Sequence, residues 1–142
     1  MVPAHWGLGV PIAADPDIGK VIHVTGDALS GFTLEFKRNY RLSSTARAQS
    51  IHLIATVDDS IVVDVPGDGS FSIDQDAADQ LERKASSIPA PGKSLTLGHL
   101  LYGTRRVIKN CRMWLRDVVG ALVIDKLFPE SAIAAMDAAP KN

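Results

Sequence analysis

The sequence predicts an α+β domain in which antiparallel strands come first and helices come last. Three observations favour this class. Apolar and polar residues alternate through 31–37, which is the period of a half-buried strand. β-branched residues fill 19–25, and glycines bound that segment. From Cys111 onward the apolar residues instead recur at i, i+3, i+4 and i+7, the spacing of one helical face.

The first half of the chain is expected to form strands joined by loops. Prolines and aspartates mark the first loop, and a polar stretch rich in Ser and Arg marks the second. The expected strands span 4–10, 19–25, 31–37, 51–57 and 61–65, and the expected loops span 11–17 and 39–48.

The second half opens with a turn and continues with helices. The glycines and aspartate of 66–70 predict the turn. An apolar face over 77–88 predicts a helix, for which Asp74 or Asp76 is the expected N-cap. Prolines follow that helix, and 95–102 is compatible with either helix or strand.

The last strong helical signal begins at the carboxyl-terminal side of Asn110. Asn is a favoured N-cap, so we expect the helix to start at Cys111 and to end before Pro129. A short final helix is expected over 130–138. The 142 residues suit one domain, 1–142, with a core over about 4–138.

Composition excludes several classes of function. The net charge is −1, which disfavours a nucleic-acid binder. No apolar run approaches the ~20 residues of a membrane span, so we expect no integral membrane association. The single cysteine excludes an internal disulfide framework and a Cys-based zinc cluster. With no signal sequence evident, the expected location is cytoplasmic, and no metal or cofactor is expected.

Cys111 is the leading candidate for a nucleophile. A thiol in the first turn of a helix lies beside unsatisfied N–H groups and the positive end of the helix dipole, which favour the thiolate. The backbone N–H of Cys111 can also bind the oxyanion of an acyl-transfer intermediate. The alternative is that Cys111 is a small buried apolar side chain, a common role of free cysteine.

A nucleophile needs a base, and histidine is the usual one. His5 and His23 lie on the two expected strands that flank the loop 11–17. If the strands pair about a turn centred at Ala14, the two imidazoles face each other on one side of the sheet. One can then act as base and the other can orient it. A register shifted by one residue would separate them.

These motifs resemble one superfamily. His5-Trp6 on an early strand, His23 on the next, and Asn110-Cys111 at a late helix start are similar to the permuted papain-like fold. It includes the NlpC-type peptidases, the lecithin:retinol acyltransferase-like proteins and the H-Ras-like suppressor phospholipase A/acyltransferases. The segments 22–27 and 35–40 are also similar to a group of small filamentous-fungal proteins with no assigned activity.

The resemblance implies a circularly permuted papain-like fold, an antiparallel sheet packed on a C-terminal helix that carries the cysteine. It also implies that His5 is the base, His23 orients it and Cys111 is the nucleophile. Trp6 and Trp114 are expected near the active centre, where they and Asn110 bind substrate. The residues after Cys111 depart from the acyltransferase pattern, in which an acidic residue, a histidine and an aromatic residue follow the cysteine.

The sequence therefore predicts a cysteine-dependent hydrolase or acyltransferase that acts on an amide, ester or thioester of a small molecule or peptide. Two alternatives stay open. One is a non-catalytic binding module that retains the fold. The other is an isomerase or cyclase that uses only the His5 and His23 pair. The sequence leaves the oligomeric state undetermined.

Overall fold

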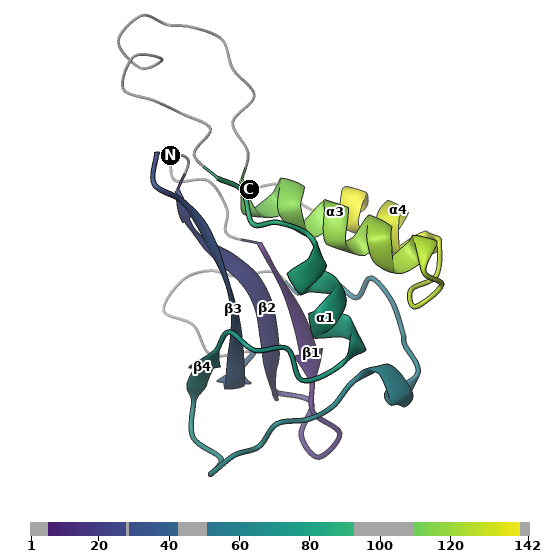
Figure 1. The fold of residues 1–142 in the computed structure, drawn as a ribbon. Coiled ribbons are helices and arrows are strands. Elements are labelled where there is room, and N and C mark those ends of the chain that lie inside the picture. Colours follow the sequence, from purple (N-terminus) through teal and green to yellow (C-terminus); the bar gives the residue numbers. More distant parts are fainter. Residues whose placement is uncertain (1–5, 28, 43–50, 93–109, 140–142) are drawn as a thin grey trace, which may run out of the picture.

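The structure is a computed structural model that describes residues 6–27, 29–42, 51–92 and 110–139. Within these residues, four antiparallel strands form one sheet in the order β1-β2-β3-β4. The predicted α+β class and antiparallel sheet are confirmed (Figure 1). The elements are β1 (Gly7–Pro11), β2 (Ile18–Asp27), β3 (Gly31–Arg41), the 3₁₀ turn η1 (Asp59–Ile61), β4 (Ser72–Asp74), α1 (Gln80–Ser87), α3 (Cys111–Ile124) and α4 (Ser131–Ala138).

The hairpin of β2 and β3 is the centre of the sheet and confirms two predicted strands. Asp27 pairs with Gly31 at its end, and the Asp27 carboxylate accepts hydrogen bonds from the backbone N–H groups of Leu29 and Ser30 at 2.9 and 2.7 Å. Gly31 has a φ of 89°, a backbone conformation that glycine adopts without a steric cost. The turn therefore fixes the register of both strands.

The third strand runs further than predicted, so the loop expected from residue 39 begins later. A β-bulge lets β3 continue to Arg41, because Asn39 takes a left-handed φ of 55°. The Asn39 amide then donates to the carbonyls of Pro66 and Ser70, at 3.0 and 2.9 Å. These bonds hold the predicted turn 66–70, which Gly69 closes through its N–H bond to the Pro66 carbonyl.

The strands predicted at 51–57 and 61–65 are wrong. These segments are irregular, and η1 lies between them, with the Asp58 side chain accepting from the Ser60 N–H at its start. Several of their apolar side chains pack against the core without any strand pairing. Burial explains part of the apolar pattern that predicted strands, whereas Ile51, Leu53 and Val63 are exposed. The short strand β4 had no prediction.

The helices form a layer on one face of the sheet, with α4 packed on α3 (Figure 1). Alternate side chains of β2 and β3 that point to this layer are fully buried, among them Ile22, Val24 and Phe36. Trp114 and its apolar neighbours on α3 complete the core. The predicted helical faces of α1 and α3 are therefore the faces that are buried.

The N-cap of α1 is Asp79, so the prediction of Asp74 or Asp76 is wrong, and the helix starts at residue 80 instead of 77. The Asp79 carboxylate accepts from the N–H of Glu82 at 2.8 Å. By contrast, Asn110 caps α3 as predicted, and the helix ends at Ile124, before Pro129. The short final helix is confirmed as α4. The ambiguous segment 95–102 lies outside the described residues.

Candidate active site around Cys111

Cys111 is the first residue of α3, as the sequence predicts. The Asn110 side-chain oxygen accepts a hydrogen bond from the backbone N–H of Met113 at 3.0 Å, so it occupies one of the unsatisfied donors of the helix start. The Cys111 residue is 6% exposed. The thiol therefore lies where the helix dipole favours a negative charge.

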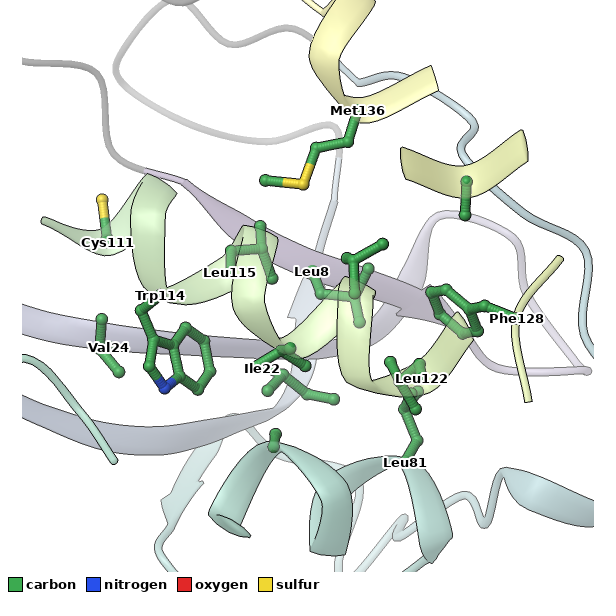
Figure 2. Packing of buried hydrophobic residues seen from close by; sticks show 14 of the residues in the cluster. Leu8, Ile22, Val24, Leu81, Cys111, Trp114, Leu115, Leu122, Phe128 and Met136 are labelled. Atoms are coloured by element: carbon green, nitrogen blue, oxygen red, sulfur yellow. The ribbon is translucent and has the colours of Figure 1, made fainter. Parts of the chain in front are cut away.

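The sulfur receives a hydrogen bond from the start of β1. The backbone N–H of Trp6 donates to Cys111 Sγ at 3.3 Å. Figure 2 shows Cys111 at one end of the apolar cluster, with its sulfur pointing away from Val24 and Trp114. The hydrogen bond from Trp6 ties the sulfur to a residue far away in the sequence. Two backbone features, a helix start and a strand start, thus converge on one side chain.

The two tryptophans predicted for the site have different environments. Trp114 is 2% exposed, and its indole N–H donates to the Ile88 carbonyl at 2.9 Å, so it anchors α3 in the core. Trp6 is half-buried beside Cys111, and the Arg112 guanidinium carbon lies 5.2 Å from the centroid of its ring. Of the two tryptophans, Trp6 is the one that contacts the sulfur, through the hydrogen bond from its backbone N–H.

The predicted pairing of His5 with His23 is wrong. Gly7, not residue 5, lies opposite His23, so the register is displaced by two residues. Hydrogen bonds in the connecting loop set this register: the Ile12 N–H donates to the Ile18 carbonyl at 2.8 Å, and the Ile18 N–H to the Asp15 carbonyl at 3.2 Å. His5 itself lies outside the described residues.

His23 forms a pair with Glu35 instead. The two residues are directly opposite on β2 and β3, and His23 Nε2 lies 3.0 Å from Glu35 Oε1. His23 is 3% exposed. Gly7 lies on the other side of His23, and a Cβ at Gly7 would approach the His23 Cβ to 3.3 Å. The same Cβ would come within 2.9 Å of Val21 Cγ1, so a side chain at Gly7 would crowd β2.

The alternation of the sheet separates His23 from α3. Ile22 and Val24, its neighbours on β2, point into the core beneath α3 (Figure 2). Successive side chains of a strand point to opposite faces, so His23 projects from the other face. The structure thus brings Cys111, Asn110 and Trp6 together, and the alternation gives no support to placing His23 at the Cys111 sulfur.

Sequence reasoning missed a second polar centre, at the start of α1. We call it the charged cluster, and it consists of Lys20, Arg38, Asp79 and Glu82, all of which are buried. Arg38 donates to both Glu82 oxygens, at 2.5 and 2.7 Å, and the Lys20 ammonium binds both carboxylates. The spacing of Asp79 and Glu82, an N-cap residue followed three positions later by Glu, is the signal that could have located it.

The charges of this cluster stabilise one another. Burial acts to raise the pKa of Glu82, but hydrogen bonds from Arg38, Lys20 and the Ala78 N–H outweigh burial and hold that pKa below its ordinary value. The hydrogen bond to Glu82 raises the pKa of Arg38, against the opposing effect of burial. The paired charges therefore join the sheet to α1.

An open surface groove lies away from Cys111. It is formed by α1 and the residues that follow α3, and the ion pair of Lys84 with Asp125 lines it. In the described ranges, no three or more His, Cys, Asp or Glu side chains are placed to hold a metal ion. No helix in the same ranges has the length and apolar character that crossing a membrane requires.

Comparison with known proteins places the chain in a family. Neither the curated proteins nor the solved structures gave a match. Residues 1–129 match DUF6540, a family of unknown function, and this match covers most of the 142 residues. The chain therefore belongs to the DUF6540 family.

Proposed function

We propose that this protein is a cysteine-dependent hydrolase or acyltransferase with a circularly permuted papain-like fold. The observation that carries the proposal is the position of Cys111 in the first turn of α3, with the Trp6 N–H directed at its sulfur. The order of the chain, with an antiparallel sheet before the cysteine-bearing helix, is consistent with the resemblance. Reactive cysteines are commonly found at helix starts of this kind.

The proposed reaction begins with proton transfer from the Cys111 thiol to His5, the base that the resemblance implies. The thiolate attacks the substrate carbonyl, and the carbon–sulfur bond forms as the carbonyl oxygen takes the electron pair. The backbone N–H of Cys111, at the unsatisfied start of α3, is the proposed donor to that oxyanion. Collapse of the intermediate expels the leaving group, which receives the proton from His5.

The acyl group then leaves the sulfur of Cys111. Attack by water gives hydrolysis, whereas attack by an amine or alcohol gives transfer; His5 removes the proton of the attacking group in either case. The proposed substrate is an amide, ester or thioester of a small molecule or peptide. The resemblance assigns His23 to orient the base, but its bond to Glu35 lies on the other face of the sheet, so the proposal rests on Cys111 and His5.

A non-catalytic binding module is the second candidate. The observation that favours it is the burial of Cys111, which is 6% exposed and packs in the apolar cluster. Free cysteines in such surroundings are commonly inert. The isomerase or cyclase alternative stays a prediction, because His5 lies outside the described residues; Gly7 is the residue directly opposite His23.

Alkylation by iodoacetamide separates the two candidates, since Cys111 is the single cysteine of the chain. We expect labelling at about pH 6.5 to be about tenfold faster than that of glutathione, whose thiol is largely protonated there. His5→Ala should abolish the advantage, because it removes the base. Mass spectrometry of the intact protein measures the rate.

His52→Ala is the matched control, because His52 is an exposed histidine, and it should leave the rate unchanged. A rate in the native protein no faster than that of glutathione would favour the binding module. A positive result justifies a second measurement, a search by mass spectrometry for an acyl group on Cys111 in protein isolated from native lysate.

A further inference from the structure

The charged cluster holds an amine and two carboxylates together in a buried site. Lys20 on β2, Asp79 at the start of α1 and Glu82 on that helix are each 5% exposed or less. The Lys20 ammonium contacts the Asp79 carboxylate and lies 2.6 Å from Glu82 Oε2. An amine and a carboxyl group held in contact are the two reactants of an amide bond.

The Asp79 carboxyl group is polarised by two backbone donors. The N–H of Glu82 donates to Asp79 Oδ1 at 2.8 Å, and the N–H of Val63 donates to Asp79 Oδ2 at 2.9 Å. Donors directed at a carboxyl oxygen stabilise the negative charge that develops there when a nucleophile attacks the carbon. Asp79 therefore has the surroundings of an electrophile as well as its role as the N-cap.

Glu82 is placed as a base for the amine. Arg38 donates to both Glu82 oxygens, at 2.5 and 2.7 Å, and hydrogen bonds of this kind favour the ionised carboxylate. Both carboxylates contact the same Lys20 nitrogen. A proton that Glu82 takes from this nitrogen can therefore be returned to an oxygen of Asp79.

We propose that Lys20 and Asp79 form an intramolecular amide bond in the folded protein, with Glu82 as the base. A proton of the ammonium first passes to the contacting Asp79 oxygen, which gives a neutral amine and a neutral acid in the buried site. Lys20 Nζ then attacks Asp79 Cγ: the carbon–nitrogen bond forms, and the carbonyl electron pair moves to oxygen. Glu82 takes one proton from the nitrogen and returns it to the hydroxyl group, which leaves as water while the carbonyl re-forms.

The fold supplies what separate lysine and aspartate side chains lack. Contact between the reacting groups replaces a bimolecular encounter, which greatly accelerates intramolecular reactions. The reaction removes one buried positive and one buried negative charge, and Arg38 and Glu82 remain as a matched pair. A small hollow lined by Lys20, Arg38 and Asp64 lies beside the amine, where the released water can leave. The bond joins β2 to α1 across 59 positions of the sequence and restricts the unfolded chain.

The mass of the denatured, intact protein tests the inference. We expect the folded protein, incubated at neutral pH, to lose the mass of one water, and the same chain kept in concentrated urea to retain the full mass of the sequence. Trypsin should then leave Lys20 uncut and yield a product in which residues 1–37 are joined to residues 48–83. The full mass in the folded native protein would overturn the inference.

Two variants and one internal control assign the residues. Lys20→Arg keeps the positive charge beside both carboxylates but removes the nucleophilic amine, so it should retain the full mass. Glu82→Gln should slow the loss of water about a hundredfold, the usual contribution of a general base. An unchanged rate in folded Glu82→Gln would refute Glu82 as the base. Lys84 contacts Asp125 in an ion pair that is partly exposed, so trypsin should still cut after Lys84.

The position of the lost water separates the amide bond from a local cyclisation. Asp68-Gly69 lies within 48–83, and closure of a succinimide there would give the same change in mass while leaving Lys20 cleavable. A loss of water confined to 48–83 would therefore overturn the inference. The native protein decides the question even if a variant does not fold. These measurements do not involve Cys111, so the proposed function is tested separately.

Discussion

The starts of α1 and α3 are capped in the same way but are surrounded by different groups. Each helix begins with a side chain that accepts a hydrogen bond from the third residue of the helix, Asp79 for α1 and Asn110 for α3. At α1, Lys20 and Arg38 surround the cap and leave every charge paired. At α3, the next groups are a thiol and an arginine with an unfilled donor.

This difference shows what each helix start contributes. The charged cluster places oppositely charged groups in direct contact, which stabilises the attachment of α1 and leaves little capacity to bind a ligand. The start of α3 holds Cys111 in the first turn of the helix, where the Trp6 N–H donates to its sulfur. The stability of the fold should therefore depend more on the charged cluster at α1, and the proposed reaction on the start of α3.

Removing Glu82 should give the largest loss of stability. Glu82→Ala leaves the Arg38 and Lys20 charges buried without their shared partner, which we expect to lower the free energy of unfolding by about 3–5 kcal/mol. Urea denaturation followed by circular dichroism measures the change. Glu130→Ala, at an exposed glutamate with no capping bond, should change stability little. Equal losses in the two variants would contradict the importance of the cluster.

Acid should weaken the same region by a smaller amount, because a protonated Glu82 can still accept hydrogen bonds. The folded protein holds the pKa of Glu82 below its ordinary value, so its stabilisation is fully present above about pH 4.3. That stabilisation is lost as the pH falls through the lower, folded pKa. Urea midpoints between about pH 6 and pH 3 should therefore fall more steeply for the native protein than for Glu82→Gln; parallel curves would refute this assignment.

The two caps allow a direct comparison of the regions. Asn110→Ala should cost about 1 kcal/mol, the usual effect of losing a cap. Asp79→Ala should cost clearly more, because Asp79 also pairs with Lys20 and accepts from the Val63 N–H. Asn110→Asp, which retains a capping oxygen, is the control for the smaller effect. Urea denaturation ranks the three variants, and equal costs for the two alanine variants would show that the additional bonds of Asp79 contribute nothing.

Local patterns were enough to predict most of the elements. The alternation of Phe32, Leu34 and Phe36 predicted β3, and the apolar face that starts at Cys111 predicted α3. Both signals are strong because each element packs against a single core. The Asn110 cap needs only its own helix, so it could be predicted from sequence as well.

The sequence predictions were wrong where contacts between residues far apart in the chain determine the structure. Residues 51–57 have the composition of a strand, but Ile54, Ala55 and Val57 pack partly against the core without strand pairing, and Ile51 and Leu53 are exposed. Three aspartates, at 74, 76 and 79, were available as the cap of α1. Asp79 takes that position, where Lys20 and Val63 also bind it. These contacts join residues far apart in the chain.

The candidate site also has a part that local sequence predicts and a part that tertiary contacts determine. A helix start at Cys111 follows from its immediate neighbours, because capping and dipole act within one turn. Which groups meet the sulfur depends on strand register and on the packing of β1 and α4 against α3. Sequence by itself therefore determined the α+β class, the central hairpin and the place of the thiol. The tertiary structure alone decided that Gly7 lies opposite His23 and that Arg112 stacks on Trp6, because side-chain packing between distant segments sets both.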